Sequence, residues 1–556
     1  MSAQDLSGAV LDFEHRRRLA LRRQRLQSAV GIGLFSLLLA ISLQRSEVFA
    51  LRGGGDPFAR FIDFLELMTP TLRAESLFAG RTVEGSLGWW FYDLPLWLEA
   101  LLQTFEMAVF GTVLGALGAA LAAFGCARNL NSSAPVRFAI RRTLEAIRTM
   151  PDIIMALIMV AAFGVGPLAG VIALSITTMG SLGKLFSETN EEVDPRQLEA
   201  LDAAGAGLLR KIRYGVIPQV LPQYASYVLI RLEGNLAAAA ALGIVGAGGI
   251  GLELQRAITY TEFDTYLAIL MLIVGMIFVL DLASEAIRHR LLGFEGVVKA
   301  APQGGERLRN LLLTLGALAV LVLIAIDLKL APDTLLSGFE RLVRMIATAF
   351  PPTPDGQLLR ILRAIGETFA IAFLGTVLAV LVAVPLGVLG AKTVVSQPIV
   401  HFLLRRGLDV FRGVPVLVWA LVMVSLFGLG PFGGVIAIAL ADIPNLAKLF
   451  SESLEACDPA PTEGVRAAGG SRLIVMRYGL APQMAPVMTG QSLFYLEGNF
   501  RHAGVLGIVG AGGIGFELDE RLRVFAFDEA FFIILLYMAA VAMLDTISSL
   551  IRKRLA

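Results

Sequence analysis

A ten-residue stretch, LGIVGAGGIG at 242–251, has a glycine spacing that is typical of nucleotide-binding turns. Gly246, Gly248 and Gly251 form the pattern GxGxxG, and Asp264 follows at about the distance where such folds place a ribose-binding acid. A dinucleotide site needs a β-strand before the glycines and a parallel sheet around them. The preceding residues, RLEGNLAAAAALGIV, instead favour a helix. The sequence therefore argues against an NAD or FAD enzyme.

A second stretch, TMGSLGKLF at 178–186, comes close to a phosphate-binding P-loop. That loop requires a glycine, four further residues, and then glycine, lysine and a serine or threonine. Thr178 stands in place of the first glycine, and Leu185 in place of the final hydroxyl residue. The sequence thus excludes ATP binding in the P-loop manner, and an ATP-driven function would need an ATPase on another subunit.

Charged side chains in apolar segments form a third set of candidates, because ionisable residues at membrane depth are costly and mark functional sites. Glu497 and Arg501 lie four residues apart, on one face of a helix. One interpretation is that Arg501 faces an interface between helices and offers a bidentate donor to an oxyanion. The alternative is a structural Glu497–Arg501 pair that satisfies only itself. Arg148 and Arg412 each precede a proline at the start of another apolar segment. We expect each arginine to anchor its segment at the membrane interface, and contact with the substrate is the alternative.

The composition places these residues in a membrane protein. The 556 residues are 56% hydrophobic and 17% charged, whereas soluble domains carry roughly 25% charged residues. A membrane-spanning helix needs about 20 mostly apolar residues. We predict an all-α polytopic membrane protein with about 12 transmembrane helices, centred on residues 27–45, 96–124, 146–165, 167–187, 218–242, 266–287, 308–329, 364–390, 410–429, 432–451, 482–506 and 530–551.

Clusters of basic residues indicate the orientation of these spans. HRRRLALRRQR at 15–25 precedes the first span, RHR at 288–290 follows the sixth, and RKR at 552–554 closes the chain. Lys and Arg accumulate on the cytoplasmic side, so we expect both termini in the cytoplasm, as an even number of spans requires. The N-terminus is basic and then apolar like a signal peptide, but it has no convincing cleavage site. We expect it to remain as a membrane anchor.

The sequence contains an internal duplication with an offset of 264 residues. GKLFSE at 183–188 corresponds to AKLFSE at 447–452, and LGIVGAGGIG recurs at 506–515. Six spans in each copy give both copies the same orientation, as in parallel repeats related by an axis along the membrane normal, with a pathway between them. We therefore divide the chain into an N-terminal anchor and periplasmic excursion (1–95), a first half (96–290), a linker with an extra transmembrane helix (291–359) and a second half (360–556).

A long polar loop lies between the fourth and fifth spans of each half, on the expected cytoplasmic side. Asp194–Pro195 and Asp458–Pro459 predict a helix N-cap followed by proline in the first turn. Gly205 and Gly207 interrupt this short helix and allow a sharp bend. A short helix that is held outside the membrane in both copies suits a mechanical contact with a partner. The alternative is a loop that only connects two spans.

The loop EALDAAGAGLLRKIRYGVIPQ at 199–219 resembles the EAA loop of binding-protein-dependent ABC transporter permeases. GKLFSE, RYGVIPQVLPQ and LEGNFRHAGVLGIVGAGGIG are most similar to phosphonate-type members, which have the MetI-like fold, and the resemblance covers roughly 96–290 and 360–556. In that family the loop helix docks into a groove of the cytoplasmic ATPase. The resemblance places this coupling motif on Glu199, Ala200 and Gly205, and on Glu463, Gly464 and Gly469, where Gly464 departs from the usual alanine.

The resemblance implies the permease subunit of a bacterial inner-membrane ABC importer, with two copies fused in one chain and no enzymatic activity of its own. Two ATPase subunits, which bind ATP and Mg²⁺, would dock at 191–215 and 455–479. A periplasmic binding protein would deliver a phosphorus oxyanion such as a phosphonate. We expect no metal, no cofactor and no nucleic-acid partner in this chain. The family pattern places Glu233, Asn235, Glu497, Asn499 and Arg501 along the pathway, although the first half has Ala237 in place of the arginine.

Three questions stay open at this point. The substrate could instead be methionine or a quaternary amine, and twelve spans in parallel halves also fit a secondary transporter. The glycine turns could form a periplasmic gate or an amide nest for an anion, or they could only allow close packing. Their residues are Gly246, Gly248 and Gly251, and Gly510, Gly512 and Gly515.

Overall fold

The computed structural model of the chain describes residue 22 and residues 29–46, 57–130, 133–292, 304–392 and 397–555. Every regular element in these ranges is a helix, which confirms the all-α class. Most of the basic stretch at 15–25 lies outside the described residues, and the expected anchor is described as a helix from Ala29 to Arg45.

The duplication predicted from the sequence is confirmed helix by helix. α15 begins at Leu358, which is 264 residues after the start of α4 at Leu94, and the following helices keep this offset. The first half contains α4 (Leu94–Cys126), α5 (Ala134–Thr149), α6 (Asp152–Phe163), α7 (Pro167–Glu191), α8 (Pro195–Ala203), α9 (Leu208–Lys211), α10 (Ile217–Leu242), α11 (Ile250–Thr259) and α12 (Phe263–Leu292). The second contains α15 (Leu358–Gly390), α16 (Pro398–Arg412), α17 (Val416–Phe427), α18 (Pro431–Glu455), α19 (Pro459–Ala467), α20 (Arg472–Val475), α21 (Ala481–Leu506), α22 (Ile514–Arg523) and α23 (Phe527–Leu555).

A helix is present at each of the twelve expected spans, but the helices differ in length and polarity. Within the described ranges, seven are long and apolar enough to cross a membrane, or up to nine if the bent pairs α5–α6 and α13–α14 each count as one span. α13 (Gly304–Asp327) and α14 (Pro332–Thr348) lie in the linker. The other expected spans correspond to α17, α21 and the helix Ala29–Arg45. The expected excursion contains α2 (Pro57–Met68) and α3 (Leu87–Trp90).

The expected continuous helices at 146–165 and 410–429 are wrong. The chain turns by 93° between α5 and α6, and α16 and α17 are also separate helices. Pro151 and Pro415 have extended ψ angles of 141° and 146°, and a proline also disfavours helical geometry in the residue before it. α6 and α17 contain only 12 residues each. At 1.5 Å per residue this is about 18 Å, which is less than the roughly 30 Å of a hydrocarbon core.

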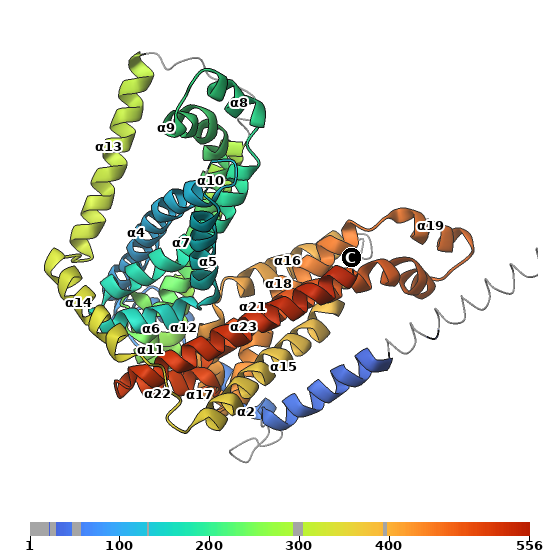
Figure 1. The fold of residues 1–556 in the computed structure, drawn as a ribbon. Helices are drawn as coiled ribbons and strands as arrows, with labels where there is room; N and C mark the ends of the chain where they lie inside the picture. Colours follow the sequence, from blue (N-terminus) through green and yellow to red (C-terminus); the bar gives the residue numbers. More distant parts are fainter. Residues whose placement is uncertain are drawn as a thin grey trace, which may run out of the picture.

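The helices that precede the two halves are exchanged in space. The helix Ala29–Arg45 packs on α15 of the second half, where the ring centroids of Phe35 and Phe373 are 5.6 Å apart. α13 and α14 instead pack against α4 and α6 of the first half (Figure 1). The duplication in the sequence therefore does not correspond to two separate bodies, because each half is covered by a helix that precedes the other.

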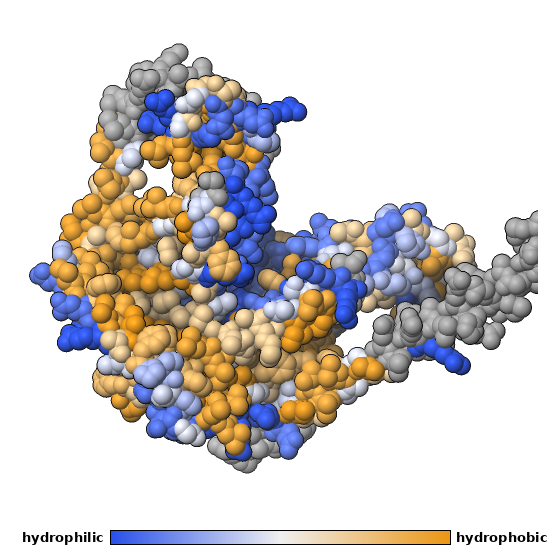
Figure 2. Space-filling model, viewed as in Figure 1, coloured by the Kyte–Doolittle hydropathy of each residue, from blue (hydrophilic) through white to orange (hydrophobic). Residues whose placement is uncertain are grey.

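The two halves form arms that diverge from a common closed end (Figure 1). One arm contains α4, α7 and α10, the other contains α15, α18, α21 and α23, and α8 and α19 lie at the far ends of the arms. At the closed end, α11 packs against α17 and α22 packs against α6. The hydroxyl of Tyr266 in α12 donates a hydrogen bond of 3.0 Å to the carbonyl of Val418 in the other half. Figure 2 shows hydrophilic residues along the notch between the arms.

Candidate functional site

A cavity of about 680 Å³ lies between the two halves. It is lined by the α5–α6 and α16–α17 junctions and by residues of α7, α10, α18 and α21. An excess of positive charge in a recessed space attracts anions. The charged lining consists of five cations, Arg148, Lys184, Arg231, Arg412 and Arg501, and three carboxylates, Asp152, Glu188 and Asp442.

Arg501 is the one residue among the five expected along the pathway that lines this cavity. Its Nη2 atom donates to both carboxylate oxygens of Asp545 in α23, at 3.0 and 2.9 Å. Its buried Nε atom has no hydrogen-bond partner among the described residues. Arg501 is therefore held at the cavity by one carboxylate, and its Nε donor is unused by the described residues in this conformation.

The two glutamates of this set form ion pairs away from the cavity. Glu497 accepts a hydrogen bond of 2.5 Å from Arg552 at the end of α23, and Glu233 lies 3.5 Å from Arg288 at the end of α12. The alternative of a Glu497–Arg501 pair is therefore wrong, because each of these two residues pairs with a different residue of α23.

Arg148 and Arg412, which we expected as interfacial anchors, both line the cavity. The Nη2 atom of Arg412 lies 4.0 Å from a carboxylate oxygen of Asp281 in the other half. By the 264-residue offset, the equivalent partner for Arg148 is Asp545, which Arg501 already occupies. No ion pair or hydrogen bond of the Arg148 side chain is found within the described ranges. The arginine–aspartate pair between the halves therefore forms for Arg412 but not for Arg148. Among the described residues, Arg148 is a cation without an ion-pair partner.

The two asparagines of the expected pathway are buried between helices. Asn235 donates to Thr112 Oγ1 in α4 at 2.8 Å and to Thr178 Oγ1 in α7 at 2.7 Å. Asn499 donates to Thr376 Oγ1 at 2.9 Å and to a carboxylate oxygen of Asp442. Each asparagine connects three helices of its half. We therefore assign them a packing role in this conformation.

This network predicts different costs for the two equivalent substitutions. Asn499→Ala should reduce stability by more than about 3 kcal/mol, because it leaves the buried carboxylate of Asp442 without its donor and an unsatisfied charged group costs more than a neutral one. Asn235→Ala leaves two hydroxyls, for which roughly 1–3 kcal/mol is expected. Thermal unfolding of both purified variants in the same detergent measures the difference. Equal losses of stability would contradict the assignment.

The polar loops form the short helices that the sequence predicted, at the far ends of the two arms. Asp194 accepts a hydrogen bond of 3.0 Å from the backbone amide of Arg196 and so caps α8. Gly205 then takes a φ of +71° and reverses the chain, a conformation that suits glycine. Gln219 at the start of α10 accepts from the amide of Asp194 at 3.3 Å and donates to the carbonyl of Gly215 at 2.7 Å. This glutamine ties the loop helix to the spanning helix.

The second loop repeats this construction. Asp458 accepts from the amide of Ala460 at 2.9 Å, Gly469 has a φ of +80°, and Gln483 accepts from the amide of Asp458 at 3.2 Å. All six residues of the expected coupling motif are exposed, namely Glu199, Ala200, Gly205, Glu463, Gly464 and Gly469. These positions are accessible to a partner, and their coupling role stays a prediction.

The glycine turns lie between α10 and α11 and between α21 and α22, at the closed end of the molecule. Gly246 and Gly248 have φ angles of +91° and +83°, and a β-carbon on Gly251 would lie 2.0 Å from the carbonyl oxygen of Ala240. The second copy has the same geometry: Gly510 and Gly512 have φ angles of +94° and +75°, and a β-carbon on Gly515 would lie 2.4 Å from the carbonyl oxygen of Gly504.

Side chains of neighbouring helices accept hydrogen bonds from the backbone amides of these turns. The amides of Gly249 and Ile250 donate to Gln103 and Thr104 of α4, both at 2.8 Å. In the second turn, the amide of Gly513 donates to the carboxylate of Glu367 at 3.1 Å. The geometry therefore favours close packing over an amide nest for an anion. A gating role for the turns stays a prediction.

Close packing at the turn predicts a large effect of a single methyl group. Gly251→Ala should lower the melting temperature, because overpacking a filled site costs about 1–3 kcal/mol. Gly234→Ala is the matched control, since no atom lies within 4 Å of a β-carbon built there. Thermal unfolding in detergent compares the two variants, and equal melting temperatures would contradict the packing argument.

The sequence analysis did not select several residues that line the cavity. Arg231 lies 3.4 Å from Asp152 through its Nη2 atom, and Asp442 binds Asn499. Comparison of the halves contained a signal for both, because Arg231 corresponds to Tyr495 and Asp442 to Thr178. Where one copy has a charged residue and the equivalent position of the other copy is uncharged, the two halves contribute differently to the cavity.

Comparison with known proteins identifies the family. Residues 103–293 and 383–556 match the family model described as "Binding-protein-dependent transport system inner membrane component". The phosphate-import permease protein PhnE of Mycolicibacterium smegmatis is 34% identical over 458 residues, which is 82% of this chain and 85% of that protein. The phosphite transport system permease protein PtxC of Stutzerimonas stutzeri is 38% identical over 193 residues, which is 34% of this chain and 70% of that protein. The chain therefore belongs to the binding-protein-dependent transport system inner membrane components, and it is a multi-pass permease subunit of an ABC importer that carries the family domain twice.

Proposed function

We propose that this chain forms the complete membrane permease of an ABC importer for a phosphorus oxyanion, such as phosphate, phosphite or a phosphonate. The observation that carries the proposal is the similarity, over 82% of the chain, to a permease named for phosphate import. The cavity supports the same substrate class because five cations face three carboxylates in it. Arginine in particular matches the oxygens of a phosphate group with two parallel hydrogen bonds.

The sequence left two alternative functions open, a secondary transporter and an importer for methionine or a quaternary amine. A secondary transporter is wrong, because the family consists of permease subunits of ABC importers. A quaternary amine favours an aromatic cage, whereas the described lining of the cavity includes no Phe, Tyr or Trp. Methionine and quaternary amines therefore serve as the competing substrates in the test below.

The two loop helices support the proposed partners. One ATPase subunit would dock on α8 and a second on α19, within residues 191–215 and 455–479, and these subunits would bind ATP and Mg²⁺. Both helices lie at the ends of diverging arms (Figure 1), where closure of two ATPases would draw the arms together. A periplasmic binding protein would dock at the closed end. In this orientation both termini of the chain are cytoplasmic.

Reconstitution tests this proposal. The full chain is co-expressed with an ABC ATPase and a binding protein from the same organism, purified as a complex and placed in lipid nanodiscs. We expect ATP hydrolysis to be stimulated by the binding protein with phosphate, phosphite or methylphosphonate, and not with methionine or glycine betaine. Stimulation by methionine or betaine alone would overturn the substrate class. A chain that transports in a proton gradient without an ATPase would overturn the mechanism.

A further inference from the structure

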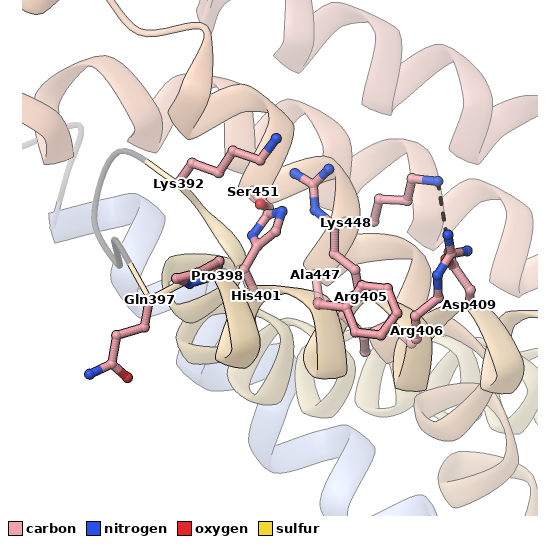
Figure 3. A pocket seen from close by; sticks show the side chains of 13 residues that line it. Lys392, Gln397, Pro398, His401, Arg405, Arg406, Asp409, Ala447, Lys448 and Ser451 are labelled. Atoms are coloured by element: carbon pink, nitrogen blue, oxygen red, sulfur yellow. Dashed lines mark ion pairs between the residues drawn. The ribbon is translucent and has the colours of Figure 1, made fainter.

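A second cavity, of about 780 Å³, lies at the end of the second half that carries α19. Its walls come from the end of α15, from α16 and from α18. Figure 3 shows Lys392, His401 and Arg405 pointing into the same space, and Lys448 extends along the cavity toward Asp409. The cavity is separate from the one between the halves, since none of its residues lines both.

The charged groups of this cavity are unbalanced. Lys392, Arg405, Arg406 and Lys448 line it with one carboxylate, that of Asp409. Arg406 and Lys448 share this carboxylate, at 3.6 and 3.9 Å. Arg405 donates one hydrogen bond of 3.1 Å to the adjoining Glu455. No ion pair of the Lys392 ammonium is found in the described part of the chain. An anion would therefore be attracted here.

Three buried polar atoms in the same cavity lack hydrogen-bond partners among the described residues. They are Nδ1 of His401, Nε of Arg405 and Oγ of Ser451. The Ser451 side chain belongs to a residue that is only 3% exposed. Buried polar atoms are almost always paired with protein, water or a ligand. Their convergence on one cationic cavity indicates a ligand that accepts several hydrogen bonds.

The equivalent place in the first half is satisfied internally. Arg141, the counterpart of Arg405 by the 264-residue offset, donates through Nε and Nη2 to the carbonyl of Cys126 at 3.2 and 3.1 Å. It also forms an ion pair with Glu191. In the second half the same guanidinium keeps its bond to a glutamate but not a bond from Nε. The duplication thus supplies an internal reference in which this arginine binds only protein.

The surroundings of the cavity indicate that its ligand is amphiphilic. α16 exposes large apolar side chains next to the basic ones, with Ile399 at 72%, Phe402 at 59% and Leu403 at 64% exposure. Phe402 itself lines the cavity, and the guanidinium of Arg406 lies 5.7 Å from its ring centroid. A helix with apolar and cationic faces at a membrane surface binds anionic lipid.

We propose that this cavity binds the phosphate headgroup of an anionic phospholipid of the cytoplasmic leaflet, with its acyl chains along the apolar face of α16. The assignment to that leaflet rests on the orientation given under Proposed function. Lys392, Arg405 and Lys448 neutralise the phosphate, and His401 and Ser451 complete its hydrogen bonds. The second half of the permease, unlike the first, is then anchored by a bound lipid beside its ATPase-docking helix.

The test compares two double variants that each remove two positive charges. Lys392→Gln with Lys448→Gln alters the cavity. Arg128→Gln with Arg137→Gln removes two charges from the first half, at the counterparts of Lys392 and His401. The purified full chain is titrated with phosphatidylglycerol in a phosphatidylcholine nanodisc or neutral detergent, and bound lipid is counted by native mass spectrometry. A lysine near a lipid surface contributes about 1 kcal/mol, so the cavity variant should bind phosphatidylglycerol roughly 30-fold more weakly. The first-half variant should bind as the wild type does.

Each outcome of the titration decides the proposal. If the two double variants bind phosphatidylglycerol with equal affinity, the cavity is not the lipid-binding site. A shift in thermal unfolding caused by millimolar inorganic phosphate, with no retained lipid, would overturn the lipid assignment in favour of a free phosphate ion. Thermal unfolding in neutral detergent verifies that both variants are folded. Substrate-stimulated ATP hydrolysis of the same variants is measured in parallel. A cavity variant that loses lipid binding but keeps this hydrolysis supports the lipid site and leaves the proposed transport function intact.

Discussion

Arg501→Ala should lower substrate-stimulated ATP hydrolysis and uptake by about ten- to a hundredfold. Arg501 lines the cavity between the halves, and its Nε atom is buried without a partner among the described residues. A hydrogen bond to a charged group contributes roughly 1.5–3 kcal/mol, and each 1.4 kcal/mol corresponds to about tenfold. The measurement is uptake into proteoliposomes that contain the complete complex, at substrate concentrations on both sides of half-saturation.

Asp545→Asn separates a substrate contact from a structural ion pair. This variant removes the carboxylate to which Arg501 donates at 2.9–3.0 Å, but it retains the arginine. A transit role predicts that Asp545→Asn keeps most of the transport activity, whereas Arg501→Ala loses it. If the two variants lose transport and thermal stability to the same extent, Arg501 serves only the structural pair and the transit role is wrong.

Tryptophan on both loop helices should abolish coupling to ATP hydrolysis. Ala200 in α8 and Gly464 in α19 are exposed, and a β-carbon at Gly464 meets nothing within 4 Å in this chain. The double variant Ala200→Trp with Gly464→Trp should therefore fold normally but fail to fit a partner groove, since a bulky side chain at a packed interface produces a steric clash. We expect loss of ATPase co-purification and of uptake to background.

The single variants test whether each loop helix binds its own ATPase. Ala200→Trp alone and Gly464→Trp alone should each reduce the ATPase content of the purified complex from two copies to one. Ser337→Trp serves as the control, because it places the same side chain on the exposed surface of α14 (Figure 1), far from α8 and α19. Full ATPase content in the double variant would show that docking uses another surface.

Local signals in the sequence were sufficient for the elements and for their repetition. The Asp–Pro dipeptides at 194–195 and 458–459 predicted the starts of α8 and α19, and the structure shows the expected capping hydrogen bonds. The 264-residue offset predicted that α4 and α15 are equivalent, and both contain 33 residues. Such features depend on a few neighbouring residues, so they are readable without knowledge of the rest of the fold.

Long apolar stretches were less informative where a helix breaks. Hydropathy alone predicted continuous spans at 146–165 and 410–429, because apolar residues continue across Pro151 and Pro415. The structure ends one helix before each proline, with a turn of 93° between α5 and α6, and brings the preceding arginines into the cavity. Whether a proline bends a helix or ends it depends on the neighbours that receive the freed backbone groups.

The sequence by itself determined the all-α class, the duplication, the two loop helices and the family resemblance, since each depends on composition or on local spacing. Only the tertiary structure decided that the helices preceding the halves are exchanged and that Arg501 pairs with Asp545 rather than Glu497. It also places Arg148 in the shared cavity without an ion-pair partner among the described residues. These outcomes depend on contacts between residues far apart in the chain. Arg501 has Ala237 as its counterpart, and it pairs with Asp545, the position equivalent to the Asp281 partner of Arg412. A few differences between the copies therefore make the site between them asymmetric.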